Sequence, residues 1–145
     1  MKIRKASEKD LFGITKIELS SGDRFREENL KEEKARTKRY FDEGNRFFIV
    51  DKMAYASISI RGYICEVTRI SVLKKKHGKG IETKLINFIE KFAEKEGCNS
   101  IIFWVNNQNY PAIALYSKLG YQVINLRSGL FHGRIIKKLI MKKEI

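Results

Sequence analysis

The stretch from Glu66 to Phe92 constrains the fold of this 145-residue chain most strongly, because it combines three signals in one order. The segment 66–72 predicts a strand, and the basic sequence Lys-Lys-Lys-His-Gly-Lys-Gly follows at 74–80. Apolar residues then recur at steps of three and four, which is the period of an amphipathic helix. The apolar face of this helix is formed by Ile81, Leu85, Phe88, Ile89 and Phe92.

A helix that begins directly after a glycine turn is a common kind of anion site. The first backbone N–H groups of a helix have no partner inside it, and the helix dipole adds positive potential there. Gly78 and Gly80 carry no Cβ, so a phosphate could approach the backbone closely. We interpret this turn as a pyrophosphate cradle, while a basic surface loop whose glycines serve only the turn is the alternative. Further positive charge comes from Lys74, Lys75, Lys76 and Lys79.

Length and composition predict a single domain spanning residues 1–145, with hydrophobic residues at 43% and no apolar run long enough to cross a bilayer. The basic start is not followed by the apolar core of a signal peptide. Cys65 and Cys98 stand far apart, which indicates reduced thiols in a cytoplasmic protein. With two histidines in the chain, we expect no metal site. The P-loop and G-x-G-x-x-G nucleotide motifs are missing.

The formal net charge of +13 favours acidic partners, although a solvated basic face that keeps the protein soluble explains it equally well. Phosphates, nucleic acid and an acidic protein or membrane surface all fit such a surplus. The basic residues are scattered along the chain, so no motif supports nucleic-acid binding, which stays open. We expect no membrane partner, and a homodimer also stays open.

The rest of the chain predicts a mixed α+β fold with one sheet flanked by helices, in the order β-α-α-β-β-β-α-β-α-β-β. Strands are expected at 2–6, 46–50, 53–60, 63–72, 100–105, 121–126 and 134–142. Helices are expected after an N-cap at Ser7, at about 28–43, at about 80–96, and after an N-cap at Asn109.

Two strand predictions concern burial. In the segment 53–60, Tyr55, Ser57 and Ser59 alternate with the apolar residues Ala54, Ala56, Ile58 and Ile60, which is typical of a half-buried strand. Residues 100–105 are almost continuously apolar, which indicates a strand covered on both faces. The helix between residues 72 and 100 predicts that this strand runs parallel to the one before the glycine turn.

With these elements in view, the chain resembles the GNAT superfamily of acyl-CoA-dependent N-acetyltransferases. The acetyl-CoA motif of that family, [Q/R]-x-x-G-x-[G/A] after a strand, corresponds here to His77-Gly78-Lys79-Gly80-Ile81-Glu82, with His77 and Glu82 departing from it. A second motif is intact as Asn109, Ala112-Ile113-Ala114-Leu115-Tyr116 and Gly120-Tyr121. The two motifs at this spacing carry the resemblance, which covers nearly the whole chain in the order of its elements.

The resemblance implies acetyl-CoA as acyl donor, an amine as acceptor, and direct transfer in a ternary complex without a metal. Tyr116 would protonate the leaving thiolate, and Glu66 stands where some relatives carry a general base. Backbone groups of 70–72 would bind the pantetheine arm, those of 78–82 the pyrophosphate, and Asn109 would also contact the cofactor. The cofactor-binding residues implied are Ile70, Ser71, Val72, His77, Gly78, Lys79, Gly80, Ile81, Glu82, Asn109 and Tyr116.

Each catalytic assignment has an alternative. Tyr116 could be a plain core residue, and Glu66 could form a salt bridge with Arg69 or another neighbour. The acceptor could be a protein N-terminus, a lysine, a small amine or an aminoacyl group on RNA. A catalytically impaired module that binds CoA or an acidic partner such as RNA is the alternative function.

Overall fold

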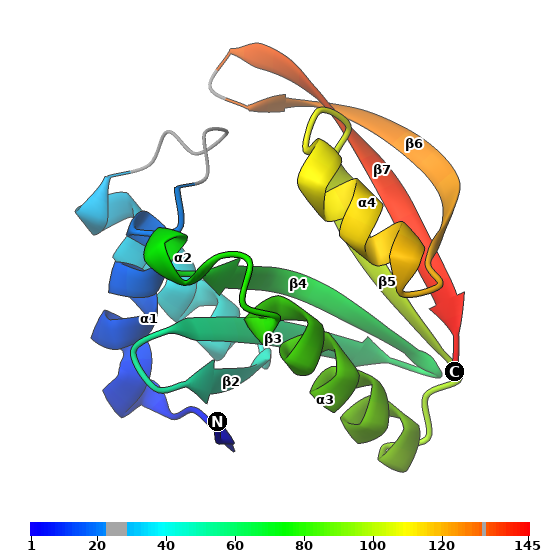
Figure 1. Cartoon of the computed structure of the whole chain (residues 1–145). Helices are drawn as coiled ribbons and strands as arrows, with labels where there is room; N and C mark the ends of the chain where they lie inside the picture. Colours follow the sequence, from blue (N-terminus) through cyan, green and yellow to red (C-terminus); the bar gives the residue numbers. More distant parts are fainter. Residues whose placement is uncertain (23–28, 132) are drawn as a thin grey trace. The chain divides into compact units, whose positions relative to one another are not determined.

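The structure of the protein, a computed structural model, describes residues 1–22, 29–131 and 133–145 (Figure 1). The predicted order of helices and strands is confirmed. The elements are β1 (Ile3–Lys5), the 3-10 turn η1 (Glu8–Asp10), α1 (Leu11–Leu19), α2 (Leu30–Asp42), β2 (Arg46–Val50), β3 (Ala54–Arg61), β4 (Ile64–Val72), the 3-10 turn η2 (Lys74–Lys76), α3 (Ile81–Lys95), β5 (Ser100–Asn106), α4 (Tyr110–Lys118), β6 (Gln122–Phe131) and β7 (Arg134–Glu144).

The described strands form a mixed seven-stranded sheet in the order β1-β2-β3-β4-β5-β7-β6. β4 and β5 are parallel, as the intervening helix predicts, and β2 and β3 are antiparallel. The chain divides into two compact units, and β4 contributes to both. Unit 1 comprises Met1–Ser59 and Thr68–Ile89, and unit 2 comprises Ile60–Val67 and Glu90–Ile145.

Unit 1 places α1 and α2 on one face of β2 and β3, and the first part of α3 on the other face (Figure 1). The Phe47 ring stacks on Phe41 of α2 with centroids 4.1 Å apart. The next residue, Phe48, points to the opposite face and meets Phe88 of α3 edge to face at 5.1 Å. Residues of α1 complete the core on the first face, among them Ile14 and Ile17.

The prediction that β3 is half-buried is wrong for its first part, because residues 54–58 are buried on both faces. Ser57 pairs with Phe47 on the side of α1 and α2, whereas Ala56 pairs with Phe48 on the side of α3. Two of the residues that suggested a solvated face, Tyr55 and Ser57, are therefore fully buried. Ser57 keeps a hydrogen-bond partner there, since its Oγ lies 2.7 Å from Oγ1 of Thr68.

Unit 2 is built from the start of β4, β5, β7 and β6, with α4 packed on one face. Phe103 of β5 stacks on Tyr116 of α4 at 4.2 Å and meets Tyr121 edge to face at 5.0 Å. The opposite face carries Trp104, which is 45% exposed, so the prediction that β5 is covered on both faces is wrong. The hairpin of β6 and β7 is longer than the sequence predicts and extends β6 to Phe131.

The capping residues and glycines that predict where helices begin and end lie at helix ends in the structure. The Asp10 carboxylate accepts from the backbone N–H of Ser7 at 2.9 Å, as in a capping box. Asn109 is the N-cap of α4, with Pro111 in the first turn. Gly97 and Gly120 follow α3 and α4 with φ of 87° and 99°, the left-handed conformation that glycine accepts without strain.

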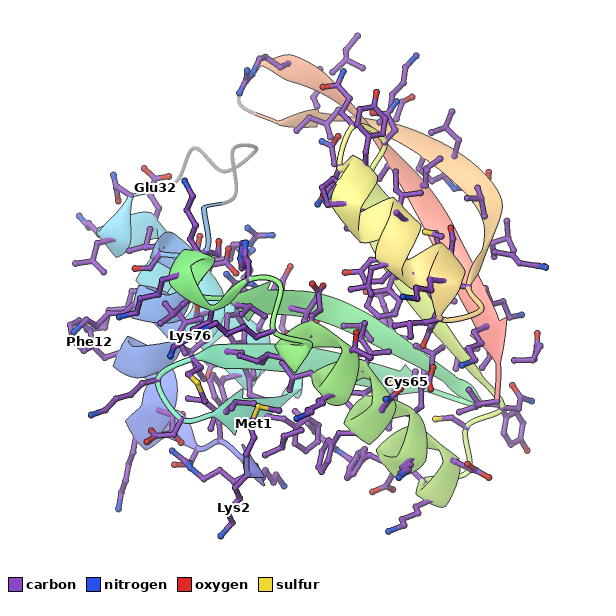
Figure 2. All side chains as sticks on the ribbon, viewed as in Figure 1. Met1, Lys2, Phe12, Glu32, Cys65 and Lys76 are labelled. Atoms are coloured by element: carbon purple, nitrogen blue, oxygen red, sulfur yellow. The ribbon has the colours of Figure 1, made fainter. Side chains whose placement is uncertain are left out.

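The described residues contain no helix that is both long and apolar enough to span a membrane. They also contain no group of three or more His, Cys, Asp or Glu side chains arranged to hold a metal ion. Cys65 and Cys98 are both buried, and Figure 2 labels Cys65. By contrast, Phe12 of α1 projects outward from unit 1 and is 53% exposed (Figure 2).

Candidate active site

The predicted cradle lies in unit 1, between η2 and α3. Gly78 and Gly80 both have φ of 75°, so the turn requires glycine for its backbone conformation alone. A Cβ at either position would meet no described atom within 4 Å, which leaves the space beside the backbone open. The turn therefore combines a conformation that excludes most side chains with open space at the two Cβ positions.

Helix α3 begins immediately after this turn, at Ile81. The backbone N–H of Lys84 donates to the carbonyl of Gly80 at 3.1 Å, so the N–H groups before Lys84 precede the first intrahelical bond. Glu82 is the acidic residue of this first turn. The N–H groups suit an anion, while the Glu82 carboxylate opposes one.

His77 bonds back to the strand that precedes the turn. Its Nε2 lies 2.9 Å from the carbonyl oxygen of Val72, and because a carbonyl only accepts, Nε2 carries the proton. The ring thereby holds the turn against the end of β4. His77 and the carbonyl of Val72, both named among the cofactor-binding residues, are thus bonded to each other in this structure.

The end of β4 is also joined to α1. The backbone N–H of Lys74 donates to the carbonyl of Ser20 at 2.9 Å, and that of Leu73 donates to Met53 at 2.8 Å. Gly22 has φ of 78°, and a Cβ there would lie 2.9 Å from Cδ of Lys74. The end of α1 and the start of η2 are therefore held in close contact.

A buried polar network lies beneath this junction, and sequence analysis missed it. Glu18 of α1 accepts through Oε1 from the hydroxyls of Tyr55 at 2.5 Å and Ser71 at 2.6 Å. The Arg69 guanidinium approaches the same oxygen at 3.3 Å. One carboxylate oxygen thus connects α1 with β3 and β4.

Arg69 extends the network to α2. Its guanidinium donates to Oε1 of Glu33 and, at 2.9 Å, to Oγ1 of Thr37. Burial alone would lower the pKa of Arg69, but its neighbours Tyr55, Glu18 and Glu33 outweigh burial and raise it. Burial chiefly, together with the Glu18 charge, raises the pKa of Tyr55. The arginine is therefore charged and the phenol neutral near neutral pH.

Unit 2 carries the other predicted residues. Asn109 accepts through Oδ1 from the backbone N–H of Ala112 at 3.4 Å, so this oxygen caps α4. Tyr116 is 4% exposed and its ring belongs to the aromatic cluster with Phe103. This packing is what a plain core residue would show. It would also hold the Tyr116 ring in one direction if its hydroxyl acts as a proton donor.

Tyr121 completes that cluster. Its hydroxyl donates to Oε2 of Glu90 at 2.8 Å, and Nζ of Lys143 binds the same oxygen at 3.0 Å. Burial first, and then the Glu90 hydrogen bond, raise the pKa of Tyr121. The hydroxyl of Tyr121 is accordingly engaged in a structural contact.

Glu66 lies in the part of β4 that belongs to unit 2, paired with Ile102 of β5. Its side chain is half-buried, and among the described residues it forms no hydrogen bond or salt bridge. The alternative salt bridge with Arg69 is not formed, because Arg69 pairs with Glu18 and Glu33.

Comparison with known sequences places the chain among acetyltransferases. Residues 14–121 match the family described as "Acetyltransferase (GNAT) family". N-acetyltransferase family 8 member 2 of Rattus norvegicus is 31% identical over 75 residues, which are 52% of this chain and 31% of the rat protein. Streptothricin acetyltransferase of Streptomyces lavendulae is 31% identical over 85 residues, 57% of this chain and 45% of that protein. The chain thus spans about a third to a half of the length of the curated relatives it matches.

Comparison with solved structures shows the same fold over the whole chain. Ribosomal-protein-alanine N-acetyltransferase from Brucella melitensis superposes with a TM-score of 0.79 at 20% identity, covering 100% of both chains. The protein yncA from Salmonella typhimurium, solved with its cofactor acetyl-CoA, superposes with a TM-score of 0.74 at 22% identity, covering 99% of this chain and 93% of that one. The fold and the match over residues 14–121 together show that this chain belongs to the GNAT acetyltransferase family.

Proposed function

We propose that this protein is a cytoplasmic N-acetyltransferase that acts as one domain and transfers an acetyl group from acetyl-CoA directly to a primary amine. The observation that carries the proposal is the open glycine turn before α3. Gly78 and Gly80 have a positive φ, their Cβ positions face open space, and α3 presents N–H groups that precede its first intrahelical bond. These features fit a pyrophosphate. The solved relative that contains acetyl-CoA supports this choice of donor.

The chain supplies binding groups and proton transfer, while acetyl-CoA supplies an acetyl group activated as a thioester. Backbone N–H groups at the end of β4 would stabilise negative charge on the carbonyl oxygen. The Glu66 carboxylate would take a proton from the amine, directly or through water, because only the neutral amine attacks. The Tyr116 hydroxyl would give its proton to the departing sulfur. Lys74, Lys75 and Lys79 are exposed around the turn and would attract the phosphates.

Amine-dependent release of CoA tests the proposal. The protein is incubated with acetyl-CoA and a library of peptides, lysine derivatives, small amines and aminoacylated RNA, and free thiol is measured. Release that requires both protein and an amine supports the transferase. Binding of acetyl-CoA by calorimetry without release on any amine would instead indicate a CoA-binding module.

Glu66→Gln is expected to flatten the alkaline rise of kcat/KM, because the amide cannot accept the amine proton. Rates are measured from neutral to alkaline pH, with Glu144→Gln as control. Glu144 is an exposed carboxylate near the end of β7, bound to Lys142 at 3.4 Å. A Glu66→Gln profile with unchanged shape would assign proton removal to another group.

Glu82→Ala is expected to tighten acetyl-CoA binding while slightly lowering the stability of the free protein. At roughly 6 Å and an effective dielectric of 20, one pair of like charges costs about 3 kcal/mol, an upper figure before salt screening. Removal of this carboxylate costs the helix itself only about 0.3–1 kcal/mol of stability, because a negative charge near the N-terminus is favourable. Calorimetric titration at two salt concentrations measures the change, and Glu94→Ala, in the last turn of the same helix, is the control. Weaker binding would show that the carboxylate assists the site.

A further inference from the structure

We propose that the hydroxyl of Ser71 binds the amine acceptor, and that Glu18 fixes this hydroxyl as a hydrogen-bond acceptor. The inference rests on the proposed acetyltransferase function and adds to it a residue that recognises the second substrate. The family resemblance implies only a backbone role for Ser71. Its side chain and Glu18 give it a second one.

The first step concerns the direction of the hydrogen bond. Oγ of Ser71 lies 2.6 Å from Oε1 of Glu18. An ionised carboxylate has no proton to give, so Ser71 is the donor. Arg69 lies 3.3 Å from the same oxygen and favours the ionised form. The hydroxyl proton of Ser71 is therefore committed to Glu18.

The second step concerns what remains of Ser71. A serine hydroxyl has one proton and two lone pairs, so a hydroxyl whose proton is committed can only accept. Such an oxygen favours a group that carries a proton. An amine satisfies it with one N–H and keeps its nitrogen lone pair for attack on a carbonyl. A thiol would offer this oxygen only a weak S–H donor, and an ester would offer it no donor at all.

The third step concerns position. Ser71 is half-buried, and its hydrogen bond with Glu18 is only partly buried. It lies between Ile70 and Val72, in the strand end proposed to hold the thioester. The bonds from Lys74 to Ser20 and from Leu73 to Met53 hold the chain immediately after Ser71. An amine bound to Ser71 would thus be fixed beside the reacting end of the donor.

The fourth step is the restraint on Glu18 itself. Oε1 also accepts from Tyr55 at 2.5 Å, and the raised pKa of that phenol, caused chiefly by burial, keeps it a donor. The carboxylate is therefore surrounded by donors on β3 and β4. It cannot turn away from Ser71 without breaking these contacts. Glu18 acts as a positioning residue, because it sets the polarity of Ser71 without touching the substrate.

The test compares Ser71→Ala, Ser71→Thr and Glu18→Gln with Ser57→Ala. Ser57 is a buried hydroxyl on the neighbouring strand β3, bonded to Thr68 at 2.7 Å, and it has no place in the proposed site. The amine that the wild-type protein acetylates fastest in the CoA-release screen serves as substrate. KM and kcat are measured for each substrate, and thermal unfolding and calorimetry with acetyl-CoA report on folding and donor binding.

Ser71→Ala is expected to raise KM for the amine by about 3- to 10-fold, because one hydrogen bond to the amine is lost. The acetyl-CoA affinity and the unfolding temperature of Ser71→Ala should change no more than those of Ser57→Ala. Ser71→Thr should recover most of the loss. Glu18→Gln should also raise KM for the amine, because its amide can donate to Ser71 and reverse the polarity of the hydroxyl.

Equal KM values for the amine in Ser71→Ala and Ser57→Ala would overturn the inference and leave the acetyltransferase function standing. Parallel loss of donor affinity and stability in Ser71→Ala, without a selective effect on the amine, would show that the contact only supports the fold. A wild-type protein that releases no CoA with any amine would overturn the proposed function, and this inference with it.

Discussion

Replacement of Tyr116 by phenylalanine is expected to lower the turnover of the acetyl transfer roughly 10- to 1000-fold, while acetyl-CoA affinity changes little. The physical reason is the loss of the proton that the phenol would give to the departing sulfur. The Tyr116 ring packs on Phe103 at 4.2 Å, and phenylalanine preserves this contact. The measurement is steady-state kinetics with the amine identified by CoA release, together with calorimetric titration of acetyl-CoA.

Tyr121→Phe is the matched control for this experiment. Tyr121 belongs to the same aromatic cluster, but its hydroxyl is engaged with Glu90 at 2.8 Å. Its replacement should cost stability and leave most of the turnover intact. If Tyr116→Phe turned over like Tyr121→Phe, Tyr116 would be an ordinary core residue of α4, and the proton would come from elsewhere.

Replacement of Arg69 by methionine is expected to destabilise the fold by about 3–5 kcal/mol, the usual cost of removing one partner from a buried ion pair. The side chain of Glu33 is fully buried and that of Arg69 is 4% exposed, so little solvent reaches the pair. Without the guanidinium, the Glu33 carboxylate of α2 stays buried and loses its charged partner. Urea unfolding of both proteins measures the difference in free energy.

Arg39→Met provides the comparison, because the Arg39 side chain is 62% exposed and lies 3.8 Å from an equally exposed Glu43. A surface pair of this kind contributes little, so its loss should hardly move the unfolding midpoint. An Arg69→Met protein as stable as Arg39→Met would show that the buried carboxylates are satisfied without the guanidinium.

The parts of the fold that could be predicted from the sequence are those with local causes. The four-residue spacing of Ile81, Leu85 and Ile89, close to the 3.6-residue period of a helix, predicts α3, and all three side chains are buried. Asn109 caps α4 through its own side chain, three residues from its partner. The positions of Gly78 and Gly80 follow from their ability to adopt positive φ. Each signal is contained within a few residues.

The buried network could not be predicted in this way, because its partners are far apart in the chain. Ser71 and Glu18 are separated by 53 positions, and Arg69 and Glu33 by 36. Helix α2 is highly charged, which indicates a solvated helix, and most of its lysines and arginines are indeed exposed. The available signal was the spacing of Glu33 and Thr37, which lie on one face, and it became meaningful only once β4 supplied Arg69.

The half-exposed Trp104 on the open face of β5 has a practical consequence for spectroscopy. It is the only tryptophan in the chain, so all indole fluorescence originates from one known position. Its exposure makes the emission sensitive to water and to any molecule that covers this face of unit 2. The wild-type protein thus carries its own optical probe, and changes around β5 can be followed without a label.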